Sequence, residues 1–179
     1  MANAVTGVEK IEIAPIATGG DIGTMPSTGW VTFQDIQEGS VTFTVPEVQV
    51  TNIRVEDKSG VRHVLPGETD PPEFSAASIW IDGAIVEMLF GGTWTSGTKT
   101  YAAPTTDVIT QLAIRFTSKA YGGEKFVLEI PVASIVPGFD GSFTRDNMLA
   151  VSFTGRATTP VDSNGDALSP WGFKFEAVA

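Results

Sequence analysis

One short stretch, D162-S-N-G-D166, has residue types and spacing that could bind a metal ion. Aspartate and asparagine oxygens that alternate around a glycine turn are typical of calcium loops. The stretch lacks the later glutamate that binds calcium with both oxygens in an EF-hand. The same residue types are also those of an ordinary surface turn. We favour the ordinary turn and predict no metal site.

The rest of the chain offers little for catalysis. Its only histidine, His63, lies in a segment rich in turn formers, and it has no cysteine. A Ser-His-Asp triad would need that histidine, and a transition-metal site would need more histidine or cysteine ligands. The paired glycines lack the spacing of a phosphate-binding loop. We therefore predict a protein that is not an enzyme, with no catalytic residues and no cofactor.

Four tryptophans, Trp30, Trp80, Trp94 and Trp171, could in principle stack against sugars. They are scattered along the chain, so we favour contacts in the core or between subunits. The binding interpretation stays open as an alternative function. In that case the chain would be an acidic β-sandwich that acts as a carbohydrate-binding or adhesion module, and calcium could be required at residues 162–166.

The amino-acid composition and net charge limit the classes of partner that the chain can bind. The 179 residues carry a formal net charge of −10, with 42% hydrophobic and 18% charged residues. Proteins that grip nucleic acid rely on Lys and Arg, so this charge argues against specific DNA binding. The N-terminus has neither a basic region nor an apolar region typical of a signal peptide. No apolar run approaches the roughly 20 residues of a membrane span. We expect folding in a cytoplasm.

Alternation of apolar and polar residues with a period of two predicts an all-β fold. We expect one domain over residues 1–179, an antiparallel sandwich or barrel, with a loop-rich segment 1–35 and a C-terminal extension 160–179. A loop is expected over residues 136–142. The clearest segment, 41–57, is either two strands or one long strand bent at Pro46, and further strands are predicted at 8–16, 107–117, 125–132 and 148–154.

One stretch, D82-G-A-I-V-E-M-L-F-G-G92, departs from the alternation with a period of two. Its apolar residues fall at helical spacing, which predicts one short α-helix over residues 82–90. Asp82 has the side chain of an N-cap, and Gly91 is suited to the position after the last turn. So short a helix needs a sheet to pack against.

The order of these elements along the chain is similar to that of a known protein family. A strand pair at 39–56 precedes a turn-rich loop, then F74-S-A-A-S-I-W-I leads into the helix and its two glycines. Strands at 130–135 and 143–154 follow. Over residues 36–160 this order resembles the major tail-tube proteins of long-tailed bacteriophages.

The resemblance implies a β-sandwich flanked by a helix, with the helix on the outer, apolar face of the sheet. Six copies would form a ring, and rings would stack into the hollow tail tube that conducts phage DNA into the host cell. The partners implied are further copies of the chain and other tail proteins, such as the tape measure, terminator and tip. The protein would be part of the virion tail, assembled in the host cytoplasm, with DNA passing through the lumen without specific binding.

Two sets of residues are expected to serve that assembly. The polar faces of strands would line the lumen, where carboxylates repel phosphates; the candidates are Glu47, Gln49, Gln111 and Glu129. Arg115 and Lys125 share this alternation, so either they pair with acidic neighbours or the face is wrongly assigned. The segment 57–72, a hairpin tip or a long loop, would join stacked rings; its candidates are Asp57, Lys58, Arg62, His63, Glu68 and Asp70.

Overall fold

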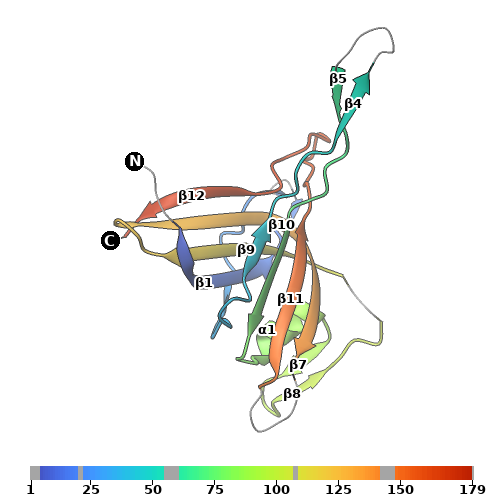
Figure 1. Cartoon of the computed structure of the whole chain (residues 1–179). Helices are drawn as coiled ribbons and strands as arrows, with labels where there is room; N and C mark the ends of the chain where they lie inside the picture. Colours follow the sequence, from blue (N-terminus) through green and yellow to red (C-terminus); the bar gives the residue numbers. More distant parts are fainter. Residues whose placement is uncertain (1–4, 20–21, 55–60, 107–108, 142–147, 179) are drawn as a thin grey trace.

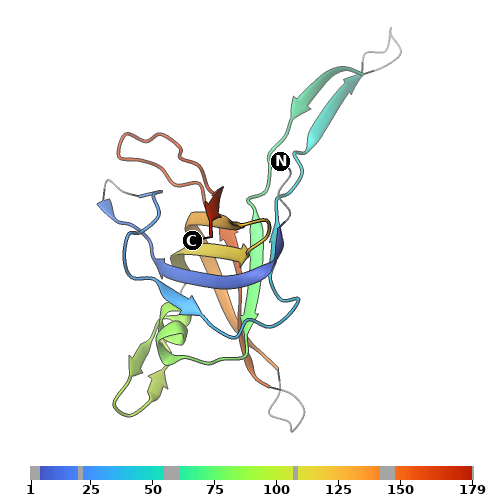
Figure 2. The ribbon, with the colours of Figure 1, turned by 90° about the vertical axis from the view of Figure 1, so that its left-hand side faces the viewer.

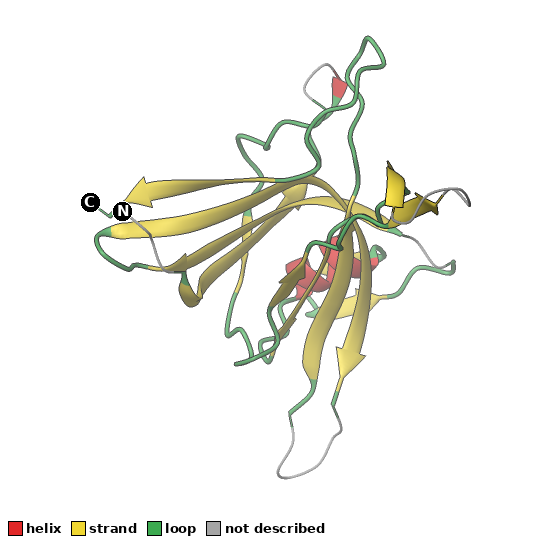
Figure 3. Cartoon of the chain, turned by 45° about the horizontal axis from the view of Figure 1, so that its top comes forward, coloured by secondary structure: helices red, strands yellow, loops and turns green. Residues whose placement is uncertain are grey.

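A computed structural model describes residues 5–19, 22–54, 61–106, 109–141 and 148–178 (Figure 1). Antiparallel strands make up most of this part of the chain, and a single short α-helix packs beside them (Figure 3). The predicted all-β fold with one flanking helix is confirmed. The strands are β1 Thr6–Pro15, β2 Val31–Phe33, β3 Thr42–Thr44, β4 Val50–Arg54, β5 Val61–Pro66, β6 Glu73–Ser78, β7 Thr93–Thr95, β8 Thr100–Ala102, β9 Thr110–Lys119, β10 Glu124–Asp140, β11 Ala150–Ala157 and β12 Gly172–Ala177.

One sheet of eight strands forms the body, in the order β2-β1-β9-β10-β11-β6-β3, with β12 also paired to β10. Strand β10 holds it together because its first part pairs with β12 and its later part pairs with β11. The pairing of β10 with β9 shifts register between Ile130 and Ala133, around Pro131. A proline cannot donate to the ladder, and bulges bend strands. We infer that β10 bends here and carries the sheet from one half to the other.

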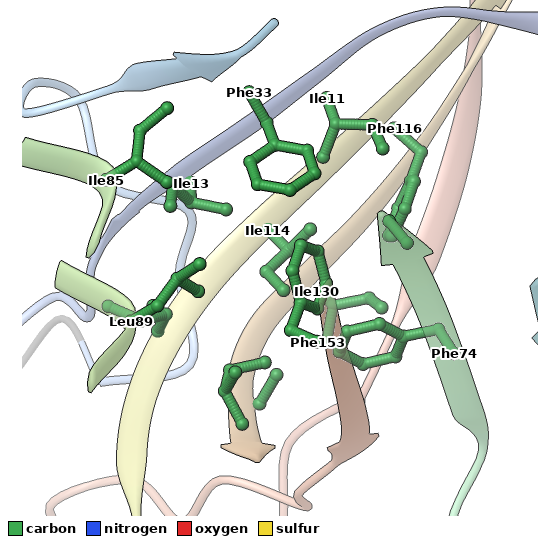
Figure 4. Close-up of a cluster of buried hydrophobic side chains, with 14 of the residues drawn as sticks. Ile11, Ile13, Phe33, Phe74, Ile85, Leu89, Ile114, Phe116, Ile130 and Phe153 are labelled. Atoms are coloured by element: carbon green, nitrogen blue, oxygen red, sulfur yellow. The ribbon is translucent and has the colours of Figure 1, made fainter. Parts of the chain in front are cut away.

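The two halves face each other across an apolar core (Figure 4). Phe33 of β2 meets Phe153 of β11 with ring centroids 5.2 Å apart, and Phe74 of β6 meets Phe116 of β9 at 5.8 Å. After β2 the chain crosses between the halves, where Gln37 N donates to Ala77 O of β6 at 2.8 Å. The sheet therefore curves back toward itself in a β-sandwich-like arrangement.

Helix α1, Gly83–Phe90, covers this core on one side, and its predicted position is confirmed. The side chain of Asp82 accepts a hydrogen bond from Ala84 N at 2.8 Å, and Gly91 follows the last turn. Ile85, Val86 and Leu89 are buried among the strands. Because eight residues cannot hold a helix in water, this packing is what keeps α1 folded.

Several sequence-based boundaries need correction. Within the segment 1–35, strand β1 matches the strand predicted over residues 8–16 and lies in the interior of the sheet, while the described residues 16–19 and 22–30 form loops and turns. The loop expected after residue 136 is a strand as far as Asp140, because β11 pairs with it there. The C-terminal extension is partly built into the sheet as β12.

The region before the helix also differs from the prediction. Residues 45–49 are not a strand, and β4 begins only at Val50. Part of the turn-rich segment 57–72 is the strand β5, which pairs antiparallel with β4, so the hairpin interpretation is the right one for residues 61–66. A second small hairpin, β7–β8, follows the helix and was not predicted.

Candidate assembly surfaces

The paired strands β4 and β5, here called the arm (residues 50–54 and 61–66), project away from the body of the molecule (Figures 1 and 2). Val50 and Val64 lie on one face of this ribbon, while Ile53 and Leu65 lie on the other, as the pairing register and the alternation of side chains require. All four are exposed, from 39% for Ile53 to 57% for Val64. A two-stranded hairpin is only marginally stable by itself. The arm also exposes apolar side chains on both faces, which is typical of a surface that binds a partner.

The expected ring-stacking residues fall on or beside this arm. Arg62 and His63 belong to β5, with His63 opposite Ile53 in the ladder. Glu68 and Asp70 are exposed in the segment that returns to the body. Asp57 and Lys58 lie outside the described residues. The described members of the set thus share one protruding element and its base.

The residues expected to line a lumen are not all together. Gln111 is exposed on β9, and Glu129 is half-buried on the neighbouring strand β10. Both alternate away from the core residues of their strands. Glu47 and Gln49 lie instead at the base of the arm, where Gln49 O accepts a hydrogen bond from Gly67 N at 2.7 Å. They do not share a strand face with Glu129, because residues 45–49 lie outside the strands.

Around Glu129 the sheet carries a row of ion pairs, here called the charged face. Arg115 Nε donates to Glu129 Oε1 at 3.1 Å, and Nη1 of the same guanidinium lies 3.9 Å from Glu12 Oε2. Lys174 of β12 reaches the same oxygen of Glu129 at 3.0 Å. The row ends in Lys10 beside Glu12 and Glu176 beside Lys174. The indole of Trp30 lies 4.6 Å from the Arg115 guanidinium, a cation–π contact.

This network decides the question about the two cations. Arg115 pairs with acidic neighbours, and Lys125 lies 2.9 Å from Glu9. Four cations and four carboxylates cancel across these pairs, so the formal charge of −10 resides on the other residues of the chain. The charged face is electrically balanced rather than acidic. Hydrogen bonds to Glu176 and Glu129 raise the pKa of Lys174, so its ammonium is held in the charged form.

At the other end of the molecule an apolar groove of about 490 Å³ opens beside the helix. Its walls come from the end of α1, from β8 and the chain after it, and from the later part of β10; they are Phe90, Tyr101, Ala103, Pro104, Ile109, Ile135, Val136, Pro137 and Phe139. The rings of Phe90 and Phe139 stack with centroids 4.8 Å apart. Tyr101 closes one side by donating from its hydroxyl to Gly91 O at 2.8 Å.

A third surface lies on β12, the last strand of the chain. Phe173 and Phe175 of β12 are 58% and 41% exposed, and both rings touch Phe126 of β10. Strand β12 pairs with β10 on one side only among the described residues. A free edge of this kind can take up another strand.

No known protein family and no curated protein matches this chain.

The other residues singled out in the sequence serve separate local roles. The Asp162 carboxylate accepts hydrogen bonds from Asn164 N at 2.8 Å and Asp166 N at 2.9 Å, which closes the turn and lowers the pKa of Asp162. Trp171 meets Phe43, Trp94 packs over Gly83, and Trp80 is 53% exposed. Each of these tryptophans has different neighbours, so they build no common platform.

The described residues contain neither a metal-binding cluster nor a membrane-spanning helix. No three acidic or histidine side chains there lie close enough together to hold a metal ion. No helix in that part of the chain is both long and apolar enough to cross a membrane.

Sequence reasoning missed the groove altogether. Its walls are far apart in the chain, and stretches such as V136-P-G-F-D140 look like a turn. The alternation in G172-F-K-F-E176 was visible and could have identified β12 as a strand.

Proposed function

We propose that this protein is a structural subunit that self-assembles into hexameric rings, which stack as the hollow tail tube of a long-tailed bacteriophage. The observation that carries the proposal is the arm, whose apolar side chains stand exposed on both faces and away from the body. A subunit that works alone would gain nothing from such a surface. A subunit that joins neighbours would bury it.

The charged face supports the second half of the proposal, the passage of DNA. Affinity for DNA comes mainly from Lys and Arg that neutralise phosphates. On this face Arg115 and Lys174 are already engaged by Glu129, so few cations are free to hold a phosphate. A lumen lined by this face would let DNA slide. Gln111 and Glu129 remain the lining residues in the proposal, while Glu47 and Gln49 move to the ring-to-ring contact at the base of the arm.

The position of the helix agrees with this arrangement. Helix α1 packs on the core side of β9 and β10, opposite the side chains of Arg115 and Glu129. One face of the sheet is thereby covered within the subunit and the other is left polar. The proposed partners are other copies of the chain and the tape-measure, terminator and tip proteins, within a virion tail assembled in the host cytoplasm.

Electron microscopy of the concentrated protein tests the proposal. We expect rings with sixfold symmetry and hollow tubes of uniform diameter. The matched control is Leu65→Asp, which places a charge on the arm without touching the core and should leave mostly unstacked particles. A chain that stays monomeric at every concentration up to saturation would contradict the proposal. Calcium-dependent thermal stabilisation of that monomer would instead favour the carbohydrate-binding or adhesion module.

A further inference from the structure

The groove beside α1 has the surface of a binding site for an apolar partner. The described walls of the groove consist almost wholly of apolar side chains. Three of these side chains are nevertheless largely exposed to solvent: Ile109 at 70%, Val136 at 59% and Phe139 at 49%. Exposed apolar surface at this density is typical of sites that another molecule covers. The groove therefore needs an occupant.

The arm has the complementary surface. It is a narrow ribbon with Val50 and Val64 on one face and Ile53 and Leu65 on the other, so it can present apolar side chains to two walls at once. Strands in such a ribbon are about 5 Å apart, which keeps the inserted element slim.

The arm cannot fill the groove of its own molecule. In both views the arm extends from one end of the body, whereas α1, β7 and β8 lie at the opposite end (Figures 1 and 2). The occupant would then be the arm of a second copy. A contact between opposite ends is heterologous, so each copy that offers an arm also offers a free groove, and the series continues without closing.

Charge favours the same pairing. The two strands of the arm contain Arg54 and Arg62 and no acidic residue, whereas the chain as a whole carries a formal charge of −10. Near the groove, burial and, after it, the charge of the Glu87 carboxylate raise the pKa of the Tyr101 phenol, and Asp140 follows Phe139. Neither carboxylate has an ion pair within the described part of the chain. Opposite charges on two docking surfaces speed and orient their encounter.

We propose that the groove lined by Phe90, Tyr101, Val136 and Phe139 receives the arm of the next copy, so that subunits join head to tail. The inference rests on the proposed function for its setting, stacked rings, but the contact itself is argued from these two surfaces. It assigns a receiving site that no pattern in the sequence predicted.

Cysteine cross-linking tests the contact, and the natural absence of cysteine makes every thiol a chosen one. The test variant carries Val64→Cys on the arm and Val136→Cys in the groove. It is incubated at high concentration with a short flexible bis-maleimide and separated on a denaturing gel. We expect a ladder of dimers, trimers and longer species, because each chain then has one thiol at each end of the contact.

Two controls make the ladder specific. Each single-cysteine variant can yield dimers at most, since a chain with one thiol links only once. The pair Val64→Cys with Val161→Cys keeps the arm thiol and places the second one on a residue of similar exposure outside the groove. We expect its yield of trimers and longer species to be at least tenfold lower.

Electron microscopy of the same samples separates this inference from the proposed function. Tubes without a specific ladder would overturn the arm–groove contact and leave the tube proposal standing. A specific ladder without rings or tubes would support the contact and count against the tube. Equal ladders in the test and control pairs would overturn the contact, and the absence of both ladders and tubes would overturn both ideas.

Discussion

Two leucines in this chain offer the same chemical change in opposite surroundings. Leu89 lies in α1 and is fully buried, with 0% of its surface exposed, whereas Leu65 on the arm is 51% exposed. We expect Leu89→Ala to destabilise the subunit and leave its capacity to assemble intact once folded. We expect Leu65→Ala to leave the subunit stable and weaken its assembly.

The magnitude for Leu89 follows from its position. Replacing a buried leucine by alanine loses transfer free energy and leaves a cavity, which together cost about 2–5 kcal/mol. Ile85, Val86 and Leu89 are the three buried residues of α1, so one third of its anchoring side chains would be truncated. We expect a loss of about 3 kcal/mol in the free energy of unfolding. For a chain of this size that corresponds to a fall of roughly 6–12 °C in the melting temperature.

The assay is urea unfolding, followed by far-UV circular dichroism, at a concentration where the protein is monomeric. Dilution matters because assembly itself would stabilise the folded chain. Leu65→Ala serves as the matched control and should change the free energy of unfolding by no more than about 0.5 kcal/mol. Sedimentation at high concentration then compares assembly of the two variants.

Two results would refute the reasoning. A loss below about 1 kcal/mol for Leu89→Ala would mean that α1 is not anchored in the core as described. A loss for Leu65→Ala as large as that for Leu89→Ala would mean that the arm is packed against its own subunit.

Three further predictions concern the charged face and the core. Glu129→Lys would place a third cation beside Arg115 and Lys174, so we expect a loss of about 1–2 kcal/mol in urea unfolding, against a smaller loss for Glu129→Gln. In Gly155→Ala the new methyl would overlap the ring of Phe74, so we expect melting experiments to show a loss of about 1–3 kcal/mol, whereas Gly172→Ala, with open space around it, should show little change. The folded-state pKa of Lys174 is raised, so its ion pairs contribute fully to stability below the unfolded pKa of about 10.4. This contribution is lost as pH rises through the folded-state pKa. The urea midpoint should therefore fall less at high pH in Lys174→Met than in the natural chain.

Much of the fold was visible in the sequence because its causes are local. The alternation in residues 8–16 predicted β1, and a change of period marked α1 between Asp82 and Gly91. Side chains in a strand alternate across the sheet, and those in a short helix must put one stripe on it, whatever the rest of the chain does. These elements keep their type wherever they pack.

Pairing across the sheet was decided only by the tertiary structure. Glu129 looked like a solvated carboxylate because its partner Lys174 is 45 residues away on β12. The polar face therefore looked acidic in the sequence and is balanced in the fold. Which strand lies beside which depends on contacts between distant segments, and alternation along one strand carries no record of them.

The arm and the groove likewise differ in what the sequence determines and what only the tertiary structure decides. Alternation predicted that residues near Val50 would favour a strand, but it could not show that the strand would leave the body in an arm. The groove exists only where Phe90, Tyr101 and Phe139 meet from one helix and two strands. The sequence alone determined which residues are apolar. The tertiary structure decided which of these apolar residues remain exposed, because a side chain is buried only where neighbouring elements pack against it.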